Sequence, residues 1–188
     1  MIKKLFLTLV FSFICLFAYA DTVTYYFNAY DSGGEEWANR PEKLVDGLTT
    51  PGTNSAYSDG PGDIELLTGN TCDGTNLGTI TKVELRIYAV AIQEGGDYIR
   101  LRPVFGGGDG DNHNVGSLSY IGEWSSYFDI TSDTNAPGTW SWANVKDLDC
   151  DVEDYQDGGI TAAFAWKVEI QVTYTGGAAA RRRIIMVE

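Results

Sequence analysis

The side chains that could support catalysis are few and scattered. His113 is the only histidine among the 188 residues, and it stands in a segment of glycine, aspartate and asparagine. The sequence has no Gly-x-Ser-x-Gly nucleophile turn, no His-Glu-x-x-His zinc motif and no phosphate-binding glycine loop. Its 26 acidic residues include pairs that would serve glycoside hydrolysis, but any acidic chain offers such pairs. We therefore predict that the protein is not an enzyme.

Two acidic segments are candidates for cation binding. The run from Asp147 to Asp157 alternates with Leu148, Cys150 and Val152, which predicts the solvated outer face of a β-strand. The segment from Gly107 to Asn112 is rich in glycine and aspartate and predicts a flexible hairpin tip. Neither pattern by itself predicts a metal site.

Cys72 and Cys150 are the cysteines that remain once residues 1–20 are set aside. In an exported protein an even pair predicts one disulfide. Because the closed loop would be long, the chain-entropy model assigns it about 4 kcal/mol. A zinc site needs more nitrogen or sulfur ligands than two cysteines and one histidine supply.

The first 20 residues predict export. Lys3 and Lys4 form a positive start, residues 5–17 are apolar, and Ala18-Tyr19-Ala20 is a small-x-small cleavage site. The apolar run is too short to span a bilayer, and no later run is long enough. We predict a signal peptide over residues 1–20 and a mature protein that is secreted, either extracellular or at the cell surface.

The mature protein is strongly acidic. The whole chain has 13 basic and 26 acidic residues and a net charge of −13. Residues 1–20 contain two of the lysines and no acid, so the remainder has a net charge of −15. Such a surface repels nucleic acid and anionic lipid, and we exclude nucleic acid as a partner.

Alternation of apolar and polar residues recurs along the mature chain, and helical periodicity does not. It predicts strands at residues 23–29, 64–67, 82–90, 98–102, 119–131 and 164–174, with another around Cys150. Ser141 is the expected N-cap of one short helical turn. About eight strands predict an all-β fold, a single antiparallel jelly-roll β-sandwich over residues 21–175.

The last of these strands has the clearest pattern. One face of it is predicted to be apolar and to point into the core. The residues on that face are Phe164, Trp166, Val168, Ile170, Val172 and Tyr174.

Two short motifs resemble a known family. Leu44-Val45-Asp46-Gly47 resembles the alanine-valine-aspartate-glycine turn of galactose-binding-like, or discoidin-like, jelly-roll modules. Val168-Glu169-Ile170-Gln171-Val172 is similar to the closing strand of that family. The resemblance implies a structural calcium. Its ligands would be the carboxylates of Asp46 and Glu169 and backbone carbonyls near Lys43 and Thr50.

A second resemblance favours a structural role. The segment from Tyr127 through Trp140-Ser141-Trp142 to Leu148 looks like the Trp-Thr-Trp turn of jelly-roll modules in phage and bacterial surface structural proteins. Glycan binding is the alternative, because it uses exposed aromatic side chains beside polar loops. Trp37, Tyr57 and Tyr120 are the candidate residues, and a place in the core is the competing interpretation of each.

Residues 176–188 form a glycine- and alanine-rich linker and a basic–apolar tail. The tail contains Arg181, Arg182 and Arg183, followed by Ile184, Ile185, Met186 and Val187. One interpretation is a disordered chain end. The other is strand addition to a neighbouring subunit, in which the arginines meet an acidic partner. Head-to-tail addition of this kind would produce a filament.

The sequence therefore predicts a secreted, non-catalytic surface module. Its first interpretation is a structural or adhesive subunit that self-assembles through the tail as a homo-oligomer or filament. The alternative is a carbohydrate-binding module with a structural calcium, and a polysaccharide-active enzyme is the third.

Overall fold

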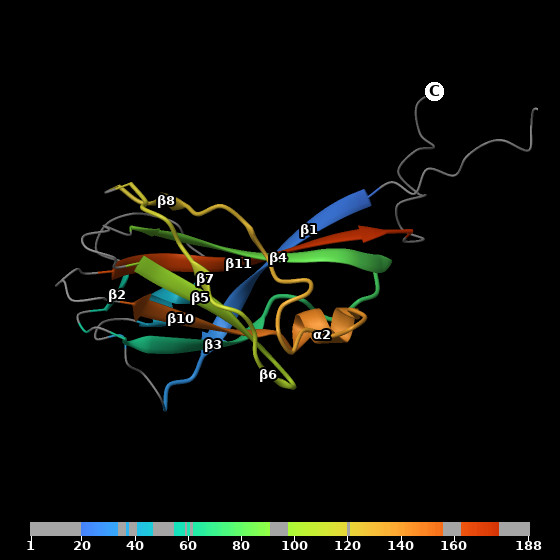
Figure 1. Ribbon diagram of the computed structural model, residues 1–188, viewed down its shortest axis with the longest axis horizontal. Helices are drawn as coiled ribbons and strands as arrows, with labels where there is room; N and C mark the ends of the chain where they lie inside the picture. The colour runs from blue at the N-terminus through green and yellow to red at the C-terminus, as the bar shows by residue number, and fades with distance from the viewer. Residues whose placement is uncertain are drawn as a thin grey trace, which may run out of the picture.

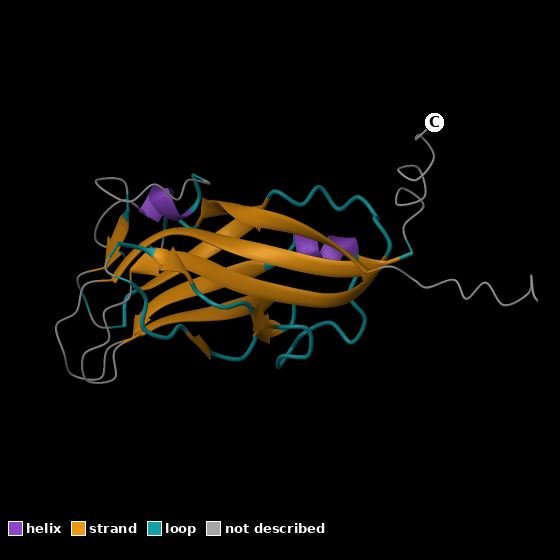
Figure 2. Ribbon diagram, turned by 90° about the horizontal axis from the view of Figure 1, so that it is seen from above, coloured by secondary structure: helices purple, strands orange, loops and turns teal. Residues whose placement is uncertain are grey.

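The chain folds into antiparallel β-sheets that pack face to face around one core (Figures 1 and 2). The computed structural model describes residues 20–33, 37, 41–46, 55–58, 60, 62–90, 98–119, 121–155 and 163–176. Within these residues there are eleven strands, and every neighbouring pair is antiparallel. The predicted all-β class is confirmed.

Six long strands form most of the structure. They are β1 (Ala20–Tyr30), β3 (Ile64–Asn70), β4 (Thr79–Val90), β5 (Tyr98–Phe105), β10 (Asp149–Tyr155) and β11 (Ala163–Thr175). The short strands are β2 (Ala56–Ser58), β6 (Gly108–Asp109), β7 (His113–Asn114), β8 (Glu123–Trp124) and β9 (Phe128–Asp129). The helices are η2 (Pro41–Leu44) and α2 (Trp142–Lys146).

The strand order is β6-β5-β10-β3-β1-β11-β4-β8, with β7 beside β5, β9 beside β4 and β2 beside β11. β1 is the strand that the two sheets share. Its residues 20–26 pair with β11, and its residues 27–30 pair with β3. We call the β11 side, with β4, β2, β8 and β9, sheet A. The β3 side, with β10, β5, β6 and β7, is sheet B.

The core lies between the inner faces of these two sheets. Alternate residues of β4 and β11 meet alternate residues of β5 and β10, and all of them are buried. The residues on β4 are Val83, Leu85, Ile87 and Ala89, and those on β5 and β10 include Ile99, Leu101, Cys150 and Val152. The period-two pattern of these segments therefore predicted the core correctly.

β11 departs from the predicted pattern near its start. Ala165 pairs with Ala89 and Lys167 pairs with Tyr88, so Trp166 is an extra residue, a β-bulge. The bulge reverses the faces on its N-terminal side, and Ala165 points into the core in place of Phe164 and Trp166. Trp166 instead packs edge-on against Tyr88, with ring centroids 5.8 Å apart. The prediction that Phe164 faces the core is wrong, because Phe164 is only half-buried. Trp166 is buried as predicted, but it packs outside the main core cluster.

The predicted strand over residues 119–131 is broken into β8 and β9. Both pair with β4, Trp124 with Tyr88 and Phe128 with Leu85. The segment therefore uses one more residue than β4 over the same distance, which interrupts the backbone ladder. The side chain of Ser125 replaces a backbone acceptor at this interruption. Its hydroxyl oxygen accepts a hydrogen bond from the backbone N–H of Ile87 at 3.1 Å.

The predicted N-cap is confirmed. Ser141 Oγ accepts a hydrogen bond from Asn144 N at 3.2 Å, and Asn144 Oδ1 accepts one from Ser141 N at 2.9 Å. This reciprocal pair is a capping box, and it begins α2 at Trp142. No helix within the described ranges is long and apolar enough to cross a membrane.

The predicted disulfide does not form in the structure. Cys72 and Cys150 are both free and buried. Cys150 is paired with Leu67 of β3. Asn70 is three residues further along β3, and an extended strand covers about 10 Å over three residues. Cys72 lies beyond that point, with its sulfur 3.9 Å from the carbonyl oxygen of Trp142. A disulfide requires Cα atoms within about 7 Å.

We expect the mature protein, unfolded without reductant, to release two thiols per chain to a thiol-specific reagent such as DTNB. In the folded state these thiols should react slowly, because both are buried and burial raises the pKa of the Cys150 thiol. Mass spectrometry of the unreduced chain is the companion measurement. A mass two hydrogens below the dithiol form, with no reactive thiol, would contradict the structure.

Candidate functional site

A pocket of about 360 Å³ opens at one edge of the sandwich. One wall is formed by residues 114–118, which follow β7 of sheet B, and the other by residues 123–128, which include β8 and β9 of sheet A. These strands lie at opposite ends of the strand order, so the two free ends of the sheet system meet here. The volume falls in the lower part of the usual range for small-ligand sites, about 300–1,000 Å³.

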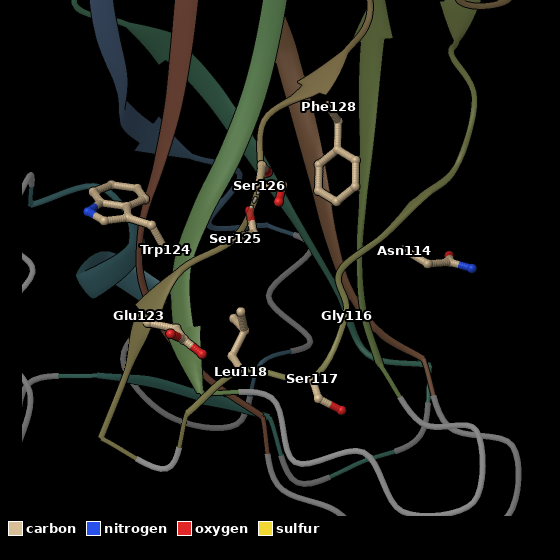
Figure 3. Close-up of a pocket in the computed structure, with 9 residues that line it drawn as sticks. All are labelled: Asn114, Gly116, Ser117, Leu118, Glu123, Trp124, Ser125, Ser126 and Phe128. Atoms are coloured by element: carbon tan, nitrogen blue, oxygen red, sulfur yellow. Dashed lines mark hydrogen bonds between the residues drawn. The ribbon is translucent and has the colours of Figure 1, made fainter.

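Figure 3 shows how the lining side chains are directed. Leu118 and Phe128 point into the space between the walls and form an apolar floor. Trp124 and Asn114 point away from this space, to opposite sides. The indole of Trp124 belongs to the outer face of sheet A, where it lies against Arg86.

Polar groups stand around this floor. Ser125 is almost buried, and its hydroxyl donates to the carbonyl of Ser126 at 2.9 Å. Ser126 itself is exposed. Glu123 accepts a hydrogen bond from the backbone N–H of Ser119 at 2.6 Å through one of its carboxylate oxygens. Ser117 adds a further hydroxyl on the facing wall. The pocket thus combines an apolar floor with hydroxyl and carboxylate groups.

Backbone hydrogen bonds hold each wall against the edge of its own sheet. Val115 is fully buried, and its N–H donates to the carbonyl of Ile99 at 2.8 Å. On the other wall the N–H of Ser125 donates to the carbonyl of Ile87 at 2.8 Å. The pocket is therefore formed by anchored segments and is largely preformed.

His113 contacts the pocket floor through the ring of Phe128. Its Nε2 lies 2.7 Å from Asp133 Oδ2, and its ring centroid is 5.4 Å from that of Phe128. Both partners of the His113–Asp133 pair are mostly buried. Although His113 stands in a segment of glycine, aspartate and asparagine, its side chain is mostly buried and contacts Asp133 and Phe128.

The neighbouring hairpin tip is also held in place. Thr134 donates to Asp111 at 2.7 Å, and the side-chain amide of Asn135 donates to the carbonyl of Asp109 at 2.9 Å. The flexible tip predicted over residues 107–112 is therefore bonded to the segment that follows β9. These bonds link the segment from β6 to β7, both of which pair with β5, to residues 134 and 135.

A row of aromatic and charged side chains crosses the outer face of sheet A. Arg86 lies between two rings, with its guanidinium carbon 4.0 Å from the ring centroid of Trp124 and 4.4 Å from that of Tyr127. Its Nε and Nη2 donate to Glu169 Oε2 at 3.0 and 2.7 Å. Lys167 contacts Glu169 Oε1 at 3.1 Å and lies 4.7 Å from the Tyr26 ring centroid. We call these six residues the aromatic–ionic row.

The row is a closed network of ion pairs and cation–π contacts. Both carboxylate oxygens of Glu169 contact a cation, and Glu169 is only 7% exposed. Desolvation raises the pKa of Tyr127, whose ring covers the Arg86 guanidinium. Cation–π contacts of this kind add about 0.5–2 kcal/mol each. The row therefore stabilises the outer face of sheet A.

The outer face of sheet B carries a second ladder of paired side chains. Tyr98 stacks on Tyr155 at 4.7 Å, and Arg100 contacts Glu153 at 2.9 Å. Arg102 Nε donates to Asp151 Oδ2 at 3.0 Å. Asp149, Asp151 and Glu153 of the acidic run share the outer face as predicted, but Asp151 is buried beneath its arginine and is not solvated. Asp154 is also buried, on the face of Cys150 and Val152, and Asp157 lies outside the described residues. Burial raises the pKa of Asp151 even though Arg102 acts in the opposite direction.

The predicted calcium ligands lie on different elements. Asp46 follows η2 and contacts Lys43 Nζ at 3.3 Å, whereas Glu169 belongs to the aromatic–ionic row. A calcium ion at Glu169 would have to replace Arg86 and Lys167. Thr50 lies outside the described residues. Calcium binding by this set remains a prediction.

The predicted glycan-binding aromatics are not in the pocket. Trp37 is 2% exposed and donates from Nε1 to the carbonyl of Val152 at 3.1 Å, so its indole packs in the core and cannot meet a ligand. Tyr57 is half-buried against Phe164, with ring centroids 5.0 Å apart. Tyr120 lies outside the described residues, as does the tail from Arg181 to Val187.

Sequence reasoning missed the pocket because its walls come from segments that are unremarkable by themselves. Phe128 was assigned to a continuous strand, and residues 114–118 drew no prediction. The usable signal was the position of Gly116 and Ser117 in a polar stretch between the predicted strands over residues 98–102 and 119–131. Such stretches commonly form the binding loops of β-sandwich proteins.

Comparison with known proteins adds no constraint on this site. No family model matches the chain, and no curated protein matches its sequence.

The ladder on sheet B generates a prediction about pH. Burial raises the pKa of Asp149 above its ordinary value of 3.8, and Asp147 and Asp151 add to the effect. The folded state therefore binds this proton more tightly than the unfolded state, so the charge on Asp149 costs stability as pH rises through its folded pKa. Asp149→Asn should increase the free energy of unfolding at pH 7, and the gain should vanish below pH 3.8.

Urea unfolding at the two pH values measures this difference. Asp149 Oδ1 accepts a hydrogen bond from Gly69 N at 3.2 Å, which an asparagine oxygen can also accept. Asp31→Asn is the matched control, because Asp31 likewise accepts from a backbone N–H but is exposed. A loss of stability in Asp149→Asn at pH 7 would show that its charge is needed in the folded state.

Proposed function

We propose that the protein is a secreted, non-catalytic β-sandwich module that binds a neutral saccharide in the edge pocket. In this role it is an adhesive subunit of a cell surface or extracellular structure. The observation that carries the proposal is the pocket itself, with an apolar floor of Leu118 and Phe128 and a polar rim that includes Ser117, Glu123 and Ser126.

A sugar ring has the complementary chemistry. Its hydroxyl groups donate and accept hydrogen bonds around the rim of the ring, and its C–H groups make the faces apolar. Serine hydroxyls can both donate and accept, and a carboxylate accepts from two hydroxyls. A pocket of about 360 Å³ that is open to solvent suits a short saccharide better than a large cofactor.

Charge supports a neutral ligand. The chain has a net charge of −13, and Glu123 places a carboxylate at the pocket. An anionic sugar would be repelled by both. The arginines of the described outer faces contact acidic partners, so they do not offset this repulsion at the pocket.

The resemblance to galactose-binding-like modules supports the same function. The Leu44–Gly47 turn and the Val168–Val172 strand resemble galactose-binding-like jelly rolls, and the antiparallel sandwich is compatible with a jelly roll. The non-catalytic part of the proposal is supported by His113, which contacts Asp133 and Phe128 behind the pocket floor. Fold resemblance alone does not assign an activity.

An array of neutral saccharides, from monosaccharides to hexasaccharides, tests the proposal. We expect saturable binding by the mature protein. Gly116→Trp should fill the pocket and weaken the strongest array ligand at least tenfold, or about 1.4 kcal/mol by calorimetry. A β-carbon at Gly116 meets no atom within 4 Å, so the substitution should be accommodated by the fold.

Gly138→Trp is the matched control. Gly138 is also exposed, also has no atom within 4 Å of a β-carbon, and lies outside the pocket. Its affinity should remain within twofold of the parent protein. Equal binding by the two variants would place the saccharide elsewhere, and no saturable binding to any neutral saccharide would sink the proposed function.

A further inference from the structure

The first half of β1 has a strand partner on one side. Residues 20–26 pair with β11, whereas β3 pairs only with the second half, from Phe27 onward. Within the described ranges, no backbone hydrogen bond links Ala20–Tyr25 to a group on the side opposite β11. Figure 1 shows this half of β1 at the outer margin of the sandwich, beside the end of β11.

The direction of the backbone groups at this edge follows from Tyr26. Its N–H donates to Thr71 Oγ1 at 3.1 Å, and its carbonyl accepts from Thr71 N at 3.0 Å. Backbone groups of a strand alternate between its two sides, so Thr22 and Thr24 direct theirs to the side of Thr71. The edge therefore offers donors and acceptors to an incoming strand, in line with the end of β3.

The surroundings of the edge are partly apolar and negatively charged. Val23 and Tyr25 are half-buried and pack against the core from its rim. Asp21 and Asp73 are exposed, and Asp73 interacts electrostatically with Tyr25. A strand that fits this edge should bring apolar side chains and positive charge.

We propose that this edge of β1 binds residues 181–187 of a second copy of the chain as an added strand. These residues combine three arginines with Ile184, Ile185, Met186 and Val187, and the chain as a whole has a net charge of −13. β11 ends at Thr175 opposite Ala20, so the last described strand before the tail ends beside the edge that the tail would occupy on a neighbour. Backbone hydrogen bonds would supply affinity, and the arginines would supply charge complementarity.

The occupant is a second copy because of the strand order. β11 and the vacant position lie on opposite sides of β1, so the tail of the same molecule would have to cross the start of β1. The tail of another molecule approaches the edge from outside. Repetition of this contact joins copies head to tail. The edge is separate from the saccharide pocket, so the two proposals can fail independently.

Light scattering of mature residues 21–188 tests the edge first. Thr22→Pro removes an N–H that points away from β11, and proline is tolerated on edge strands. Thr22→Val keeps the N–H and the β-branched shape. We expect the parent protein and Thr22→Val to associate and Thr22→Pro to have the mass of one chain, with matching thermal melts for the two variants.

The tail is tested with a second matched pair. Ile185→Asp adds a charge to the proposed strand, whereas Ala179→Asp adds the same charge to the linker. Ile185→Asp should be monomeric, and Ala179→Asp should associate like the parent protein.

Mixing the two monomeric variants gives the decisive result. Thr22→Pro retains a functional tail and Ile185→Asp retains a functional edge, so the mixture should form a one-to-one dimer that does not grow further. A mixture that remains monomeric would overturn the proposal. A parent protein that is monomeric at every concentration, or a Thr22→Pro variant that still associates, would overturn it as well.

Discussion

β1 is shared between the two sheets, and the arrangement of the remaining strands depends on this one strand. Residues 20–26 are in register with β11 and residues 27–30 with β3, and Phe27 is fully buried at the change of partner. One continuous backbone therefore joins the sheets on one side of the core. The two ends of the strand order, β6 and β7 on sheet B and β8 and β9 on sheet A, come together on the other side. The pocket forms there, because the edge strands of the two sheets lie close together but do not pair.

The charges of the molecule are distributed in a way that bears on recognition. On both outer faces, arginines and lysines contact carboxylates or lie over aromatic rings, as Arg86 and Arg100 do. These contacts pair the positive charges of the described sheets with carboxylates or aromatic rings of the same molecule. The excess charge of the chain is therefore negative. Recognition at the pocket must then rest on hydroxyl groups and on apolar contact with Leu118 and Phe128. The same excess of negative charge favours the binding of a basic strand at the free edge of β1.

Much of the fold could be predicted from alternation alone. Val83, Leu85, Ile87 and Ala89 point inward as expected, and Ser141 caps α2 as its position before Trp142 indicated. The errors in β11 and in the predicted strand over residues 119–131 share one physical cause. A single extra residue in a strand, such as Trp166 in β11, reverses the faces on one side of it without disturbing the apolar pattern. The pairing of Cys72 with Cys150 and the position of the pocket depend on three-dimensional register, which one sequence does not contain.

The most direct test of the account is the location of the bound saccharide by NMR. Backbone amide signals of the mature protein would be followed during titration with a neutral oligosaccharide that binds on the array. We predict that the shifts cluster on both walls of the pocket, at residues 114–118 and 123–128. Shifts confined to the aromatic–ionic row around Arg86 and Tyr26, or scattered over the surface, would contradict the assignment of the pocket as the binding site.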